Sequence, residues 1–77
     1  MRLETWSYTR RYQIKAIFDV YPHVTVLFRQ IGSYYFIYSM KGLTKDHLPG
    51  RKEYVQMEYL LNKELGLRDA YRQRKFR

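Results

Sequence analysis

The chain has 77 residues, and 15 Lys and Arg against seven Asp and Glu give it a formal net charge of +8. This length allows one domain at most, with a thin margin of stability that partner binding or self-association would increase. The chain contains no Cys, which excludes disulfide bonds and thiolate metal sites.

The charge also narrows the choice of partner. A small domain this basic favours polyanions, with nucleic acid first and an anionic membrane surface second. The longest uncharged run, 30–40, has 11 residues and is too short to span a membrane. The N-terminus lacks the apolar core of a signal peptide. We therefore expect a cytoplasmic protein with no membrane-spanning segment.

Residues 1–11 are predicted to form an N-terminal arm or an additional strand. Trp6 and Tyr8 alternate with small polar residues, and the alternation continues into Tyr12, which is typical of one long or bent strand. Arg10 and Arg11 place two adjacent cations at its end.

Three further strands are predicted at 12–20, 24–30 and 34–41, because residue character alternates with a period of two. Turns of three residues, 21–23 and 31–33, keep the even positions of all three strands on one face. This even face is apolar and needs a cover. It comprises Tyr12, Ile14, Ala16, Phe18, Val20, Val24, Val26, Phe28, Tyr34, Phe36, Tyr38 and Met40. The odd face carries Gln13, Lys15, Thr25, Arg29, Ser39 and Lys41, interrupted by Ile17, Leu27, Tyr35 and Ile37.

A helix over about 52–65 is the predicted cover, after a loop at 42–50. Its apolar residues recur every three or four positions. They are Tyr54, Met57, Leu60, Leu61 and Leu65. Gly66 suits a left-handed cap, with Leu67 packing back on the last turn. Residues 68–77 are predicted to be a basic tail or a frayed helical extension, which can be removed without loss of the fold.

The predicted fold class is therefore α+β. An antiparallel meander of three strands, or four if the N-terminal arm joins it, is covered on one face by one C-terminal helix. Residues 1–77 form a single small basic domain, with sheet and helix in 12–67.

No catalytic constellation is visible, so we expect a protein that is not an enzyme and uses no cofactor or metal. His23 and His47 stand singly, beside turns that contain Pro. The sequence has no Gly-rich phosphate loop and too few metal ligands. A small toxin-like ribonuclease that uses His47 with a nearby Arg or Lys is the one enzymatic alternative.

Residues 35–51 read YFIYSMKGLTKDHLPGR. This segment resembles the N-terminal arm-type DNA-binding domain of tyrosine integrases from Gram-positive conjugative transposons and phages. Those domains carry an aromatic strand ending Tyr-Ser-Trp-Lys, then a Thr-x-Asp-x-Leu-Pro loop, a Gly, basic residues and a helix. The resemblance implies a three-stranded antiparallel sheet on a C-terminal helix, with the sheet in the DNA major groove. It also implies that Tyr38, Met40 and Lys41 lie at the groove-facing end, and that Arg51 and Lys52 contact the DNA backbone.

Charge and resemblance together predict a small nucleic-acid-binding protein from a phage or mobile element, with duplex DNA favoured. Cations would contact phosphates, while Tyr35 and Gln13 would reach base edges. The predicted contact residues are Arg10, Arg11, Gln13, Lys15, Arg29, Tyr35, Lys41, Arg51, Lys52, Arg72, Arg74 and Lys75.

The alternative is a phage-encoded inhibitor or regulator of a host nucleic-acid enzyme. Ile17, Leu27 and Ile37 would form an apolar stripe on the odd face of three adjacent strands. Such a stripe is expected at an interface with a protein partner or in a homodimer.

Overall fold

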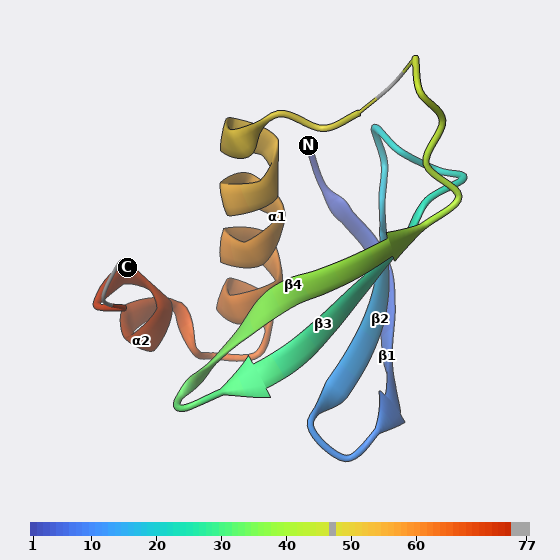
Figure 1. The fold of residues 1–77 in the computed structure, drawn as a ribbon. Helices are drawn as coiled ribbons and strands as arrows, with labels where there is room; N and C mark the ends of the chain where they lie inside the picture. The colour runs from blue at the N-terminus through green and yellow to red at the C-terminus, as the bar shows by residue number, and fades with distance from the viewer. Residues whose placement is uncertain (47, 75–77) are drawn as a thin grey trace.

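Four strands form one antiparallel sheet in chain order, and two helices follow (Figure 1). The computed structural model describes residues 1–46 and 48–74, so the predictions for His47 and Lys75 lie outside the described residues. The elements are β1 (Leu3–Arg10), β2 (Gln13–Phe18), β3 (Thr25–Ile31), β4 (Tyr34–Lys41), α1 (Arg51–Glu64) and α2 (Arg68–Arg72). The predicted α+β meander is confirmed, and the N-terminal segment supplies the fourth strand.

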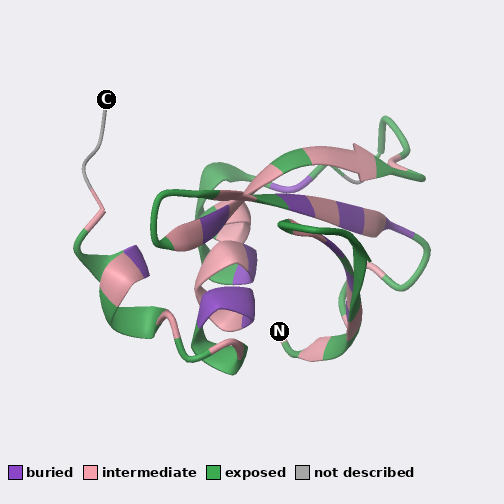
Figure 2. Ribbon diagram, turned by 90° about the horizontal axis from the view of Figure 1, so that it is seen from below, coloured by how far each residue is buried: buried purple, intermediate pink, exposed green. Residues whose placement is uncertain are grey.

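The predicted core is confirmed at the centre of the sheet. Alternate residues of β2 and β3 point to one face, where they are buried against Met57 and Leu61 of α1. The buried residues on this face are Ile14, Ala16, Phe18, Val26 and Phe28, together with Val24 just before β3. We call this side of the sheet the inner face and the opposite side the outer face. Figure 2 shows the buried residues, in purple, in the strands of the sheet and along α1.

The turn between β1 and β2 differs from the prediction. Tyr12 does not begin a strand on the inner face; it lies in a tight turn with φ 66° and is 53% exposed. Its carbonyl oxygen accepts a hydrogen bond from the Gln30 N–H at 2.9 Å, which holds the turn to β3. Val20 was also predicted to lie on the inner face, but it follows the end of β2 and is 50% exposed.

A β-bulge in β4 reverses part of the predicted face assignment. Leu27 pairs with Ser39 and Phe28 pairs with Ile37, so Tyr38 is an extra residue without a partner on β3. The odd residues before the bulge therefore turn inward: Tyr35 is 5% exposed, and Ile37 packs against the core. The predictions that Tyr35 and Ile37 face outward, and that Tyr38 faces inward, are wrong, since Tyr38 is 40% exposed.

Helix α1 begins one residue earlier than predicted and ends in the predicted glycine cap. The Gly50 N–H donates to Oε1 of Glu53 at 3.0 Å and so fixes the first turn. At the other end Gly66 has φ 78°, and the Leu67 N–H reaches the Asn62 carbonyl oxygen at 2.7 Å. This is a Schellman ending, which returns Leu67 to the core.

Residues 68–72 follow the helical alternative rather than the predicted basic tail, and they are not a dispensable extension. They form the short helix α2, whose Tyr71 is only 1% exposed. The Tyr71 hydroxyl donates to Oε1 of Glu58 at 2.8 Å, and its ring meets Tyr34 edge to face at 5.8 Å. Burial first, and then the hydrogen bond to Glu58, raises the pKa of the Tyr71 phenol. The side chain therefore stays a neutral hydrogen-bond donor and joins α2 to α1 and β4.

Candidate nucleic-acid interface

The outer face of the sheet carries one cation from each of its four strands: Arg10, Lys15, Arg29 and Lys41. The strand register places them there. Lys15 pairs with Leu27, and Lys41 pairs with Thr25, on the side opposite the buried residues. All four side chains belong to exposed residues. The sequence prediction that Lys15, Arg29 and Lys41 face outward is confirmed, and Arg10 joins them from β1.

Arg10 reaches this face because of a second pairing irregularity. The register shifts between Tyr8 and Arg10, so Thr9 is an extra residue and Arg10 pairs with Gln13. Gln13 in turn pairs with Arg29. Two guanidinium groups and one amide are therefore brought together across three strands.

These residues surround a shallow hollow of about 390 Å³ on the outer face. Its lining comes from all four strands. It consists of Thr9, Arg10, Gln13, Leu27, Arg29, Tyr38 and Lys41. The bulge places the Tyr38 ring in this lining, where the guanidinium carbon of Arg29 lies 4.6 Å from the ring centroid. A cation against an aromatic ring at this distance is an attractive contact that orients both groups.

No acidic residue lines this hollow on the outer face. The first 41 residues contain only two acidic residues, Glu4 and Asp19. Both lie beside Arg2, whose guanidinium is 3.7 Å from Glu4 and 3.9 Å from Asp19. The Arg2 N–H also donates to Asp19 at 2.7 Å and lowers the pKa of that carboxyl. The cations around the hollow therefore keep their charge available for an external anion.

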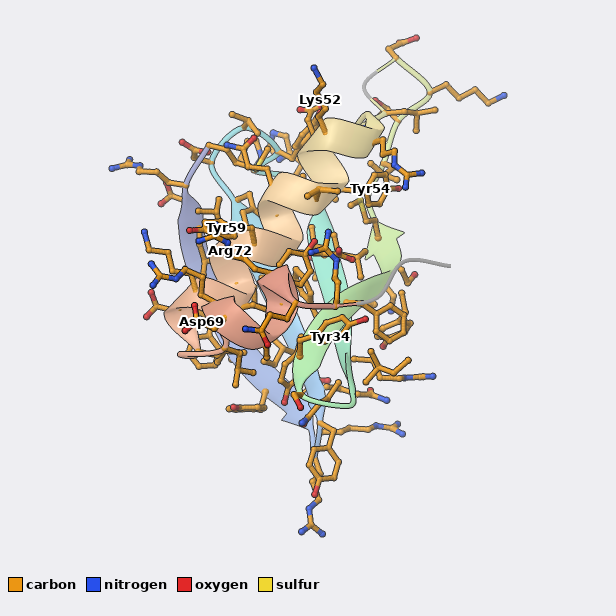
Figure 3. All side chains as sticks on the ribbon, turned by 90° about the vertical axis from the view of Figure 1, so that its left-hand side faces the viewer. Tyr34, Lys52, Tyr54, Tyr59, Asp69 and Arg72 are labelled. Carbon is orange, nitrogen blue, oxygen red and sulfur yellow. The ribbon has the colours of Figure 1, made fainter. Side chains whose placement is uncertain are left out.

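The other predicted contact residues lie elsewhere. Arg11 is in the β1–β2 turn, with its guanidinium carbon 5.3 Å from the Tyr12 ring centroid. Arg51 and Lys52 begin α1, and Arg72 belongs to α2. Figure 3 looks at the molecule from the helix side, and Lys52 and Arg72 are seen there in front of the sheet. A ligand lying on the outer face would not meet Arg51, Lys52 or Arg72, which belong to the helices on the other side of the sheet.

A groove of about 430 Å³ runs between α1 and α2. It is lined by Lys52, Val55, Gln56, Tyr59, Tyr71, Arg72 and Arg74. Within it, the Arg74 guanidinium lies 3.7 Å from the Tyr71 ring centroid and donates to the Tyr71 carbonyl oxygen at 2.7 Å. Arg74 is thus engaged in holding α2.

Tyr35 and Tyr38 exchange the roles that the sequence predicted for them. Burial, and then the neighbouring Tyr8 phenol, raises the pKa of Tyr35, which lies under the sheet and does not reach an outer ligand. The apolar pattern gives no sign of this exchange, because residues 34–38 are large and apolar at odd and even positions alike. The apolar stripe is also incomplete: Ile17 and Leu27 are half-buried on the outer face, whereas Ile37 is inside.

Residues 1–46 and 48–74 contain no group of three or more His, Asp or Glu side chains that could hold a metal ion. Neither of the described helices is long and apolar enough to cross a membrane.

A family model described as "Uncharacterised protein YuzH" matches residues 2–76. The chain belongs to the YuzH family. No curated protein and no solved structure matches it. The match includes all four strands and both helices, so the outer face with its cations lies entirely within the YuzH family domain.

Proposed function

We propose that this protein binds nucleic acid through the outer face of its sheet, without catalysis, and that duplex DNA is the favoured ligand. The observation that carries the proposal is the set of three cations, Arg10, Arg29 and Lys41, around one hollow whose lining contains no acidic residue, with Lys15 exposed on the same face. Phosphate contacts by Lys and Arg supply most of the affinity of such proteins.

The roles within the site follow from the chemistry of each side chain. Arg10, Lys15, Arg29 and Lys41 would contact phosphates and fix the position of the protein on the strand. Gln13 and Tyr38 lie in the same hollow or beside it and can donate and accept hydrogen bonds at base edges or sugars. Duplex DNA, a phage or mobile-element origin and a cytoplasmic location come from the sequence resemblance and composition.

Salt dependence tests the proposal directly. Four neutralised phosphates predict a slope of log K against log[salt] of about −3.6 for duplex DNA, and each lost contact should flatten it by about 0.9. Fluorescence anisotropy with a labelled duplex would measure this for the wild type, Arg29→Ala and Lys41→Ala. Lys63→Ala on the exposed side of α1 is the matched control, since it removes one positive charge away from the outer face.

The expected result is weaker binding and a flatter slope for Arg29→Ala and Lys41→Ala, with Lys63→Ala close to the wild type. A uniform loss in all three variants would mean that net charge alone drives binding. Absence of binding to duplex and single-stranded DNA and to RNA at about 50 mM salt would reject the proposal.

The alternative is a protein-binding inhibitor or regulator of a host nucleic-acid enzyme. It depended on three apolar residues on adjacent strands, and Ile37 packs on the inner side. Ile17 and Leu27 remain half-buried on the outer face, and Phe36, which pairs with Arg29, is the half-buried apolar residue of β4 on that side, so the apolar patch lies between cations.

A further inference from the structure

The two edge strands of the sheet, β1 and β4, differ in whether side chains occupy their outward-facing backbone groups. At the β4 edge, Asn62 of α1 binds both the N–H and the carbonyl oxygen of Tyr35, at 2.8 and 2.9 Å. Oε2 of Glu58 accepts a hydrogen bond from the Ile37 N–H at 2.8 Å. These contacts occupy backbone groups with which another strand would pair, so the β4 edge is closed at Tyr35 and Ile37.

The β1 edge is open. β1 pairs with β2 on one side, and no side chain of the described residues hydrogen-bonds to its backbone. Six of its eight residues are exposed, and Tyr8 is 58% exposed although its side chain lies on the inner side. An exposed strand with unpaired backbone groups can pair with another strand.

The sequence of β1 is symmetric about Ser7. Reading outward from Ser7, the aromatic Trp6 and Tyr8 are equivalent, then Thr5 and Thr9, then the opposite charges of Glu4 and Arg10. When two copies pair antiparallel with Ser7 opposite Ser7, Trp6 faces Tyr8 of the other copy, and Glu4 and Arg10 come near each other beyond the register shifts at Glu4 and Thr9. Aromatic pairs, Thr pairs and opposite-charge pairs are the combinations that stabilise neighbouring strands.

The register is restricted further by the two faces of the strand. Trp6 packs on the core, whereas Ser7 pairs with Lys15 and faces outward. Only registers that pair inner residues with inner residues keep both cores intact. Pairing centred on Trp6 would place Glu4 near Tyr8 and Arg10 near Arg2, while pairing centred on Ser7 brings Glu4 of each copy near Arg10 of the other.

We propose that two copies of this chain join through their β1 strands, antiparallel and centred on Ser7. The result is one sheet of eight strands, four from each copy. An antiparallel pair of this kind has its two-fold axis perpendicular to the sheet, so both sets of helices lie on one side. The exposed Tyr8 ring meets Trp6 of the second copy. Formation of this interface does not require nucleic acid. In the dimer the outer faces of the two copies lie edge to edge on the same side of one sheet.

Cysteine crosslinking tests the register. The chain has no Cys, so Ser7→Cys introduces the only thiol. In the proposed dimer the two Cα atoms at position 7 are about 4.5–5.5 Å apart, which a disulfide can bridge. The control is Thr5→Cys, on the same face of the same strand. Its two copies would lie about 14 Å apart along the paired strands, which is too far for a disulfide. Mild oxidation should crosslink Ser7→Cys alone.

Charge reversal tests the pairing independently of any crosslink. In Glu4→Arg, the new cation of each copy would lie against Arg10 of the other copy. In Arg10→Glu, the new carboxylate of each copy would lie against Glu4 of the other copy. Each single variant should raise the dimer dissociation constant about tenfold or more, and the double variant should restore it. Sedimentation equilibrium without nucleic acid would measure this. Glu64→Arg and Lys63→Glu, exposed on α1, match the two changes in net charge.

The expected result is specific crosslinking at position 7 together with rescue by the double charge reversal. A wild type that stays monomeric at about 1 mM, where even a weak dimer would be half formed, would overturn the proposal. Equal crosslinking at positions 5 and 7, or a double variant as weak as the singles, would also overturn it. Circular dichroism of each variant establishes that it is folded before these comparisons.

Discussion

Asn62 and Tyr35 are joined by two hydrogen bonds that imitate the pairing of neighbouring strands. Oδ1 of Asn62 accepts from the Tyr35 N–H at 2.8 Å, and its Nδ2 donates to the Tyr35 carbonyl oxygen at 2.9 Å. The same Nδ2 also donates to the Glu58 carbonyl oxygen at 2.7 Å. A buried side chain of α1 thus takes the place of a fifth strand beside β4.

Substitution of Asn62 by Ala is predicted to be among the costly changes in this protein. It would leave the Tyr35 N–H and carbonyl oxygen without partners in a buried position, at a cost of about 2–4 kcal/mol of unfolding free energy. Urea denaturation would measure this. The neighbouring exposed residue provides the control, because Lys63→Ala should change stability by about 0.5 kcal/mol or less. Similar midpoints for the two variants would contradict the role assigned to Asn62.

The bulge at Tyr38 makes a second prediction about relative stability. Tyr35→Ala should lower the unfolding free energy by about 3–5 kcal/mol, since it empties a buried aromatic site. Tyr38→Ala should lower it by about 1 kcal/mol or less, because the ring is exposed and its main contact is Arg29. Thermal melts in which Tyr38→Ala is the weaker protein would show that β4 pairs without the bulge.

The contact of Tyr71 with Glu58 predicts that residues after Leu67 are needed for full stability. Tyr71→Phe would remove the hydroxyl donor at 2.8 Å and cost about 1–2 kcal/mol, while Tyr71→Ala would cost about 3–5 kcal/mol. Chemical denaturation of both variants would measure these losses, with the exposed Arg72→Ala as the control on the same helix. A chain cut after Leu67 that melts like the full chain would refute the structural role of α2.

Two carboxyl groups predict how stability responds to acid. Hydrogen bonds from the Gly50 N–H and then the Tyr21 hydroxyl lower the pKa of Glu53, and the Arg2 N–H lowers that of Asp19. A lowered pKa in the folded state means that the stabilisation is present above the unfolded pKa of about 4 and is lost as pH falls through the folded pKa. The melting temperature should therefore drop below about pH 4.

Variants separate these carboxyl groups from the rest. Glu53→Gln and Asp19→Asn should each reduce the fall in melting temperature between pH 5 and pH 3. Glu64→Gln, on the exposed end of α1, gives the same change in charge at another place. A melting profile of the double variant as steep as that of the wild type would assign the acid response to other groups.

The sequence was informative where one face of an element alone is apolar. Ile14, Phe18 and Phe28 alternate with polar residues, and Gly66 ends a clear helical stripe, so strands, core and helix end could be predicted. Tyr35 and Tyr38 could not be assigned, because a run that is aromatic at both parities fits either register and a bulge decides between them.

The outer-face site could likewise be predicted only where simple alternation decides which way a side chain points. Lys15, Arg29 and Lys41 follow from simple alternation. The contributions of Tyr38 and of Arg10 beside Gln13 depend on irregular pairing, which no local pattern encodes. Tyr71 was missed because one aromatic residue among several cations resembles a solvated tail. Its buried position arises from contacts with Glu58 and Tyr34, which are distant in sequence.

The order of the elements has a consequence for synthesis on the ribosome. All four strands follow one another through short turns, so the sheet can form by local contacts as the chain emerges. Met57 and Leu61, which cover its apolar side, are made about 20 residues after β4, or roughly 1–4 s later at usual elongation rates. During that interval Phe18 and Phe28 lie on an uncovered apolar surface. Nascent chains on neighbouring ribosomes are therefore most prone to aggregate with one another at this stage.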